Sequence, residues 1–319
     1  MGQFTAPQFD QRCTPRDALG VDLRAVLYRV SRLRVAAIRF LNPAPLMWDF
    51  DHPPQAATLQ QHYQVETMMP AQCAERLASG TADLGLVPTA AFAENPALRI
   101  VPGCAIASKG AIRSLLLVHR MFPGREAIRT IAADTSSRAT LAYLQIMVRH
   151  FWRLPATFLP HAPDLDAMLA AADAALLIGD PALLALEDRD ARGARTGEAL
   201  VYLDLGAEWR DLTGLPWISA VWGVRAEALN GAGQSRDQII RDQLIQDLSA
   251  SRDAGLSHID DLADEWATRI AVPRATIQTY LSRNIYYTLD EECLEGLRRF
   301  YALAAECHVL PALPELQML

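Results

Sequence analysis

The residues best suited to chemistry lie between Ile131 and Met147, in the sequence IAADTSSRATLAYLQIM. The pattern predicts a short strand, a turn of small hydroxylated residues and an amphipathic helix. A helix N-terminus has unpaired N–H groups and a partial positive charge, so this one is suited to hold a carboxylate or phosphate. An ordinary capped helix is the alternative. The helix can begin on Asp134 or on one of the three residues after it, and the residues of this candidate anion cradle are Thr135, Ser136, Ser137, Arg138 and Thr140.

Asn42 is a second candidate, because it follows the strand predicted over residues 33–41. Pro43 and Pro45 come directly after it and cannot continue a strand, so they hold the chain extended and fix the place of the Asn42 side chain. The alternative is a turn asparagine that bonds to its own backbone.

Two more polar segments stand at predicted strand ends. Ser108 and Ser114 bound the loop before the strand at 115–120, and Gly179-Asp180 ends the strand at 174–180. Pro181 then stands at a helix start, so Asp180 is predicted to be an N-cap that also faces a ligand. Ligands of open α/β sheets bind beyond the carboxyl ends of strands, so we expect these segments to line one cleft.

The sequence contains no pattern for metal, cofactor or nucleophile chemistry. Its seven histidines never stand at a metal-ligand spacing such as HExxH, and it has no GxSxG, GxxxxGK[ST] or GxGxxG motif. We therefore expect no metal and no cofactor, and a cleft that binds or converts a small anion through hydrogen bonds and positioning.

Composition narrows the class of protein further. A net charge of -7 and scattered Lys and Arg residues argue against a nucleic-acid partner. Five widely spaced cysteines without a CxxC pair fit a reducing compartment. No run approaches the ~18 apolar residues of a membrane span, and the first 34 residues have no signal-peptide pattern, so we expect a cytoplasmic protein with no membrane association.

The order of predicted elements indicates an α/β architecture with a largely parallel sheet. The pattern of strand and helix starts afresh after Phe122-Pro-Gly124, which suggests two lobes. We expect an N-terminal arm over 1–33, a first lobe over 34–118 and 223–319, and a second lobe over 119–222. Residues 238–317 are expected to be helical, with a stop at Gly255, and a loop is expected before the strand at 217–224.

Seven segments together carry a resemblance to a known family. They are RFLNPAPL at 39–46, LASGTADLGLVP at 77–88, SKGAIRSLLL at 108–117, DTSSRATLAYLQIM at 134–147, DAALLIGDPAL at 173–183, LDLGAEWRDLTGLPWISAVW at 203–222 and YYTLDEECLEGLRRFYALA at 286–304. In this order they resemble the menaquinone-biosynthesis enzymes of the futalosine route, and among those the chorismate dehydratase family.

The resemblance implies a two-lobed fold like that of type II periplasmic binding proteins, and a lyase that needs no cofactor. The implied reaction removes water from chorismate, a small dicarboxylate, to give 3-[(1-carboxyvinyl)oxy]benzoate. Our hypothesis is that the 135–138 turn binds one carboxylate and that Asn42 and Ser114 lie at the reacting centre. An amide is a poor base, so the enolpyruvyl carboxylate of the substrate is the expected proton acceptor.

Two alternatives stay open at the level of sequence. A non-catalytic binding protein for a small acid has the same architecture and the same polar cleft. The sister enzyme of the pathway, 1,4-dihydroxy-6-naphthoate synthase, shares the implied fold and acts on a different acid.

Overall fold

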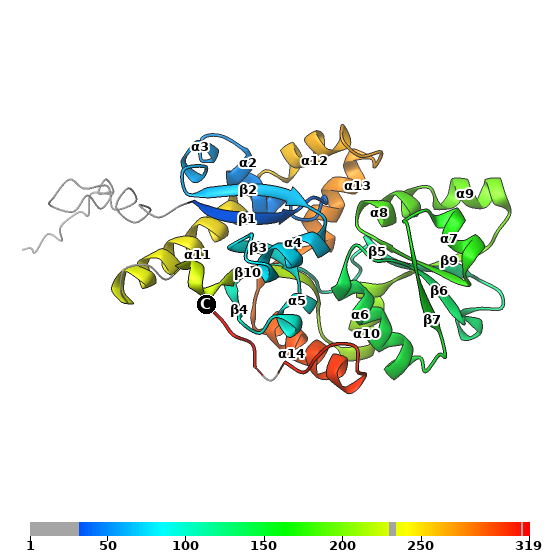
Figure 1. Cartoon of the computed structure of the whole chain (residues 1–319). Coiled ribbons are helices and arrows are strands. Elements are labelled where there is room, and N and C mark those ends of the chain that lie inside the picture. The colour runs from blue at the N-terminus through cyan, green and yellow to red at the C-terminus, as the bar shows by residue number, and fades with distance from the viewer. Residues whose placement is uncertain (1–31, 230–233, 314) are drawn as a thin grey trace, which may run out of the picture.

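Each lobe of the chain is built around one β-sheet. The computed structural model describes residues 32–229, 234–313 and 315–319. In Figure 1 the first lobe lies on the left, and the second lobe, drawn in green, lies on the right. Most of the N-terminal arm expected over 1–33 lies outside the described residues, and Leu33 already begins the first strand.

The first lobe contains a six-stranded sheet in the order β11-β4-β10-β3-β1-β2. β1 runs parallel to β2 and β3, whereas β10 is antiparallel to β3 and β4, and β11 is antiparallel to β4. The strands are β1 (Leu33–Ile38), β2 (Tyr63–Met68), β3 (Leu84–Pro88), β4 (Leu98–Ser108), β10 (Trp217–Arg225) and β11 (Tyr286–Leu289).

The second lobe contains a five-stranded sheet in the order β7-β6-β8-β5-β9. β6 is parallel to β7 and β8, and β5 is antiparallel to both β8 and β9. Its strands are β5 (Leu115–Arg120), β6 (Thr130–Asp134), β7 (Thr157–His161), β8 (Ala174–Ile178) and β9 (Leu200–Asp204). Both sheets are therefore mixed. The prediction of a largely parallel sheet holds for the direction of most strands, but β10 and β11 in the first sheet and β5 in the second run the opposite way; β10 and β5 each arrive from the other lobe.

Helices cover the sheets and carry several cleft residues on their first turns. Before β5 they are η1 (Ala44–Met47), α2 (Trp48–Asp51), α3 (Ala56–Leu59), α4 (Pro70–Ala78) and α5 (Ala90–Glu94). Between β5 and β10 they are η2 (Arg125–Ala127), α6 (Arg138–Ile146), η3 (Met147–Phe151), α7 (Leu165–Ala171), α8 (Asp180–Glu187), α9 (Arg189–Thr196) and α10 (Leu205–Thr213). After β10 they are η4 (Ala226–Leu229), α11 (Gln234–Ser257), α12 (Ile259–Ala267), α13 (Arg274–Thr279), η5 (Tyr280–Asn284) and α14 (Glu291–Glu306).

The expected lobe boundaries at 118/119 and 222/223 fall inside strands. The first boundary cuts β5, which belongs to the second sheet, and the second boundary cuts β10, which belongs to the first sheet. We therefore propose that the chain passes between the lobes over residues 109–114 and 205–216. Ser114 then stands at the end of the first crossing.

Three local predictions are wrong for identifiable reasons. The expected loop before β10 contains β9 and α10, because Asp204 caps α10 by accepting the Ala207 N–H at 3.0 Å. The expected helical tail is interrupted by β11, whose tyrosines and threonine suit a strand paired with β4. Gly255 does not stop α11: a Cβ there would lie 2.1 Å from the Pro45 carbonyl oxygen, so glycine permits close packing.

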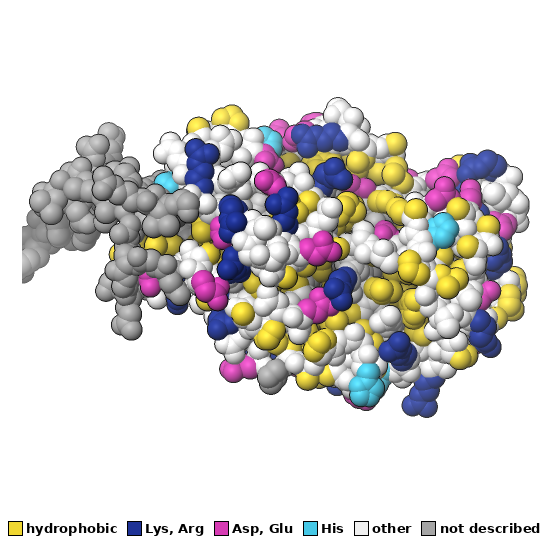
Figure 2. Space-filling view, viewed as in Figure 1, with side chains coloured by type: hydrophobic (Ala, Val, Ile, Leu, Met, Phe, Trp, Pro, Cys, Tyr) yellow, Lys and Arg dark blue, Asp and Glu magenta, His cyan; other side chains and the backbone are white. Residues whose placement is uncertain are grey.

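The helix from Arg138 and the last helix begin as predicted. Ser137 caps α6, and Asp290 caps α14 by accepting the Cys293 N–H at 2.9 Å. Apolar runs such as β3 and β8 are buried along their whole length, as expected for strands covered on both faces. On the face shown in Figure 2, acidic and basic side chains are intermingled.

Candidate active site

A cleft between the two lobes brings together polar groups that are far apart in the sequence. It encloses about 370 Å³ of empty space, its mouth included. Its lining is Ile38, Phe40, Asn42, Pro70, Pro88, Ile106, Ser114, Leu115, Ser137, Thr140, Ile178, Gly179, Ser219 and Ala220. None of these lining residues carries a charge, so an anion bound here would meet neutral hydrogen-bond donors and helix dipoles.

Half of the predicted site residues line this cleft: Asn42, Ser114, Ser137, Thr140 and Gly179. They come from the loop after β1, the residue before β5, the first turn of α6 and the end of β8. The carboxyl ends of strands β1 and β8 therefore meet at the cleft, which is the geometry that the fold class predicts.

Asn42 is the least satisfied polar residue of the lining. Its side-chain carbonyl oxygen is buried and has no hydrogen-bond partner among the described residues. A buried polar atom without a partner costs about 1–3 kcal/mol, so a ligand that pairs with it gains binding energy. The Asn42 oxygen is thus available to a donor that the rest of the described chain does not supply, and the alternative of a turn asparagine bonded to its own backbone is not what the contacts show.

Ser114 is held by a tyrosine that the sequence did not reveal. Tyr280, the first residue of η5, donates its hydroxyl to Ser114 Oγ at 2.8 Å, and both residues are buried. Burial raises the pKa of the Tyr280 hydroxyl well above its ordinary value, so it remains a donor. Because Ser114 accepts this bond, its own hydroxyl hydrogen is directed elsewhere, and the cleft is beside it.

The backbone before Ser114 is strained and held in place. Arg113 has φ 63°, in the left-handed region that costs a non-glycine residue about 1 kcal/mol. Asp204 accepts the N–H of Ile112 at 3.1 Å and the N–H of Arg113 at 2.6 Å. One carboxylate therefore caps α10 and also fixes the crossing segment that delivers Ser114.

The first turn of α6 brings Ser137 and Thr140 of the predicted anion cradle to the cleft. Ser137 Oγ accepts bonds from the Thr140 hydroxyl at 3.1 Å and the Thr140 N–H at 3.4 Å. Both side chains are buried. Since Ser137 accepts from Thr140, its own O–H is left to donate toward the cleft, beside the free N–H groups of the helix start.

The other predicted residues of this turn do not line the cleft. Thr135 is exposed. Ser136 is half-buried, and its carbonyl accepts the N–H of Ala71 in the first lobe at 3.2 Å. Arg138 is 63% exposed and forms an ion pair with Glu94 of α5 at 2.6 Å. Arg138 thus contacts the opposite lobe outside the cleft, because helical geometry turns it away from Ser137 and Thr140.

Ser108 and Asp180 are also placed differently from the prediction. The Ser108 hydroxyl donates to the Gly110 carbonyl at 2.9 Å, within its own loop. Asp180 is the first residue of α8, and Gly179 occupies the N-cap position, so the predicted Asp180 cap is wrong. The Asp180 carboxylate instead accepts the N–H of Leu41 in the first lobe at 3.1 Å, and burial raises its pKa to about 6.

The lobes are in contact around the cleft. Besides the bonds of Ser136 and Asp180, Tyr143 of α6 accepts the N–H of Ile218 in β10 at 3.3 Å. The Tyr143 ring also stacks on Trp217 and Phe300, with centroids 3.9 and 4.0 Å apart. The two lobes are therefore packed against each other around the cleft.

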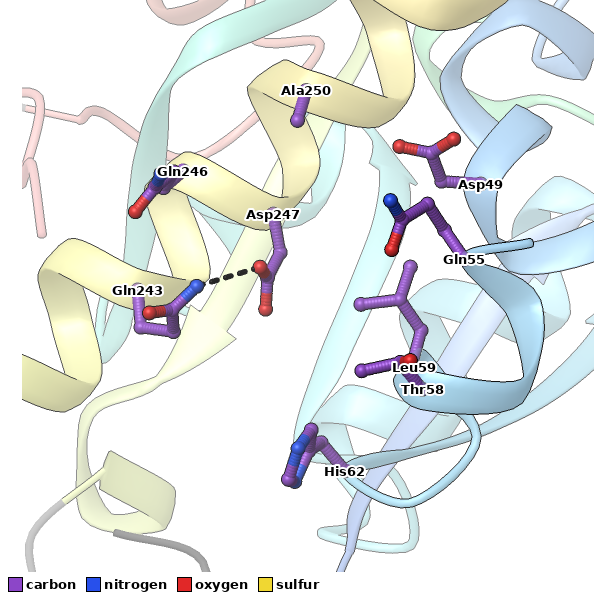
Figure 3. Close-up of a pocket in the computed structure, with 9 residues that line it drawn as sticks. All are labelled: Asp49, Gln55, Thr58, Leu59, His62, Gln243, Gln246, Asp247 and Ala250. Atoms are coloured by element: carbon purple, nitrogen blue, oxygen red, sulfur yellow. Dashed lines mark hydrogen bonds between the residues drawn. The ribbon is translucent and has the colours of Figure 1, made fainter. Parts of the chain in front are cut away.

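A separate hollow lies within the first lobe alone (Figure 3). It lies between α11 and the α2–α3 segment, and Asp49 and Asp247 both face it. Asp247 accepts bonds from the Tyr63 hydroxyl at 2.9 Å and from Gln243 at 2.7 Å. Two carboxylates repel an anion, so this hollow suits the expected dicarboxylate less well than the cleft.

Two structural absences concern the described residues only. Within 32–229, 234–313 and 315–319, no group of three or more His, Cys, Asp or Glu side chains is arranged to hold a metal ion. Over the same ranges, no helix is long and apolar enough to cross a membrane.

Comparison with known proteins gives both a family and a fold. A family model described as menaquinone biosynthesis matches residues 33–306. The chorismate dehydratase of Thermus thermophilus is 29% identical over 261 residues, covering 79% of this chain and 89% of that protein.

Solved structures support the fold alone. Protein AF1704 from Archaeoglobus fulgidus aligns with a TM-score of 0.64 at 15% identity, over 88% of this chain and 98% of that one. The periplasmic aliphatic sulphonate binding protein SsuA from Escherichia coli aligns with a TM-score of 0.58 at 14% identity, over 90% and 95%. The two-lobed periplasmic-binding-protein-like fold predicted from the sequence is therefore confirmed.

Proposed function

Because the chain belongs to the menaquinone biosynthesis family, we propose that it is a chorismate dehydratase, which converts chorismate to 3-[(1-carboxyvinyl)oxy]benzoate and water. The observation that carries the proposal is the Thermus thermophilus relative of that name, which spans most of both chains. The uncharged cleft with an anion cradle on one wall is consistent with it.

The reaction needs little from the protein beyond binding and orientation. The C–H bond at the ether-bearing ring carbon and the C–O bond of the ring hydroxyl break, and the electron pair of the C–H bond becomes part of the aromatic ring. The proton and the departing hydroxide leave as water. Aromatisation provides the driving force, so the protein must hold the dianion and orient the groups that exchange the proton.

The α6 wall supplies the binding site for one carboxylate in this proposal. The Ser137 hydroxyl and the first N–H groups of α6 are neutral donors in a buried setting, and the Thr140 hydroxyl orients Ser137 by donating to it. Such donors bind a carboxylate strongly because little water competes for them. Thr135 and Arg138 are left out of the substrate contacts because they are exposed, and Ser136 because it does not line the cleft.

The opposite wall supplies the reacting centre. The side-chain N–H of the Asn42 amide donates to the enolpyruvyl carboxylate and orients it as the proton acceptor, and the buried Asn42 oxygen accepts from a substrate hydroxyl. Ser114, held by Tyr280, donates to the departing hydroxyl. Each of these contacts is a hydrogen bond to a group whose charge changes in the transition state. Enzymes use contacts of this type to accelerate a reaction.

The experiment is direct. Purified protein is incubated with chorismate, and the ultraviolet spectrum and product mass are followed. We expect an aromatic product lighter than chorismate by one water. Saturable binding of chorismate with an unchanged spectrum would contradict the proposal and favour a binding protein. Turnover of the sister synthase's substrate in a parallel assay, with none of chorismate, would contradict it in favour of that enzyme.

A further inference from the structure

The dipeptide Gly179-Asp180 connects the two candidate catalytic residues. On one side, the Gly179 N–H donates to the Ser114 carbonyl at 2.7 Å. On the other side, the Asp180 carboxylate accepts the N–H of Leu41, the neighbour of Asn42, at 3.1 Å. A short segment of the second lobe thus bonds to the backbone of Ser114 and to that of Leu41, the residue directly before Asn42.

Packing at Gly179 strengthens this connection. Gly179 has φ +71°, and a Cβ on it would lie 2.9 Å from the ring of Phe40. The Phe40 ring therefore rests on the glycine backbone, where no side chain could fit between the lobes. Phe40 and Leu41, the two residues before Asn42, are both engaged from across the cleft.

We propose that Asp180 is a positioning residue, whose carboxylate fixes the Asn42 amide by holding the Leu41 N–H when the lobes are packed together. The inference rests on the proposed function. It replaces the sequence-based expectation that Asp180 contacts the substrate.

The surroundings of Asp180 argue against the role of a proton acceptor. Asp180 is not among the lining residues of the cleft, although its neighbour Gly179 is. One of its oxygens already accepts a backbone N–H from the other lobe. The contact joins the lobes, so in this proposal it holds the segment before Asn42 whenever the lobes are packed together.

Two substitutions separate positioning from acid–base chemistry. Asp180→Asn keeps an oxygen that can accept the Leu41 N–H, whereas Asp180→Ala removes it. We expect kcat for chorismate to fall about 10- to 100-fold in Asp180→Ala with KM within threefold, because the α6 cradle is intact. Asp180→Asn is expected to keep kcat within about threefold. Asp190→Ala, the same change at an exposed aspartate of the second lobe, is the matched control.

Hydrogen exchange at the Leu41 amide tests the contact without turnover. We expect slow exchange in the wild type and in Asp180→Asn, and faster exchange in Asp180→Ala, read by mass spectrometry at single-residue resolution. Thermal melting checks that each variant is folded, and Asp180→Ser replaces Asp180→Ala if the latter does not fold.

The outcomes distinguish this inference from the proposed function. Equal loss of kcat in Asp180→Asn and Asp180→Ala would overturn positioning in favour of a role for the charge. Full kcat in Asp180→Ala, or unchanged Leu41 exchange, would overturn it altogether. If the wild type leaves chorismate unchanged, the proposed function fails, while the exchange measurement still decides whether Asp180 holds the first lobe.

Discussion

The two walls of the cleft differ in how their polar groups are satisfied. On the second lobe, Ser137 and Thr140 bond to each other within one turn of α6. On the first lobe, the Asn42 amide oxygen is buried without a partner among the described residues, and the segment before it is held from the other lobe. The α6 wall is complete within its own lobe, whereas the Asn42 wall is completed by the second lobe and by a ligand.

From this difference we expect the α6 wall to determine the affinity for the substrate and the Asn42 wall to determine the rate of turnover. A preformed set of donors binds an anion in the open and the closed form alike, which lowers KM without accelerating the chemical step. A group placed only on closure acts where the transition state forms, and therefore contributes to kcat. Four substitutions test whether the two walls have these separate roles, and they are given in order of decreasing expected effect.

Replacing Asn42 with alanine should have the largest effect. We expect kcat for chorismate to fall by about 10²-fold or more, because a polarised contact to the reacting group is lost. KM should change little, since the α6 wall is untouched. Steady-state kinetics from the ultraviolet signal of the product measure both values.

Asn95→Ala serves as the control for that experiment, because Asn95 belongs to the first lobe but does not line the cleft. Full turnover in Asn42→Ala would remove the distinction between the walls.

Replacing Asp180 with asparagine tests how much stability the protein loses by burying the carboxylate that supports the Asn42 wall. Burial raises the pKa of the Asp180 carboxyl from 3.8 to about 6, so the folded state disfavours the ionised form. The contribution of Asp180 to stability is thus most favourable below about pH 4 and is lost as the pH rises through about 6. Asp180→Asn avoids this loss. We therefore expect its free energy of unfolding at pH 7.5 to exceed that of the wild type by about 2 kcal/mol after allowance for partial exposure, and its melting temperature to be higher.

The difference should shrink toward zero as the pH falls to about 4, which thermal melts across that range would show. A variant that is less stable than the wild type at pH 7.5 would mean that the charge stabilises the closed lobes.

Replacing Ser137 with alanine should weaken binding more than turnover. We expect KM for chorismate to rise about tenfold, because one donor to the carboxylate is lost, and kcat to stay within about threefold. The variant also loses the cap of α6, which costs about 1 kcal/mol of stability. Isothermal titration with the product gives affinity independently of turnover. A kcat loss as large as that of Asn42→Ala would show that both walls act in the chemical step.

Replacing Arg138 with alanine should have the smallest effect. Arg138 is 63% exposed and pairs with Glu94 outside the cleft, and exposed pairs contribute little to stability. We expect KM and kcat within about twofold of the wild type, with Glu94→Ala giving the same result. A tenfold rise in KM in Arg138→Ala alone would restore the sequence-based hypothesis that this guanidinium binds the substrate.

Much of the fold follows from local pattern. Alternating and fully apolar runs indicated the strands of both sheets up to β8, and the hydroxylated turn indicated the start of α6. β9 and β11 were missed because each is short and gains its partner from far along the chain, β5 in one case and β4 in the other. Strand propensity is weak evidence until that partner is known.

The site was predictable where a residue's position depends on its own segment. Ser137 caps its own helix, and Asn42 follows its own strand before Pro43, so both reach the cleft as expected. Tyr280 and Asp204 were missed, since each acts on the 112–114 segment from more than 90 positions away. The spacing of residues along the sequence does not predict such a long-range contact.

Residue order and short-range periodicity were enough to predict the α/β class, the two lobes and the capped start of α6, and the family followed from the resemblance of seven segments. Only the tertiary structure decided which polar groups share the cleft, that Arg138 pairs across the lobes and that Asp180 holds Leu41. Hydrogen bonds and burial depend on distances in space, and two chain segments set those distances only after the lobes have packed together.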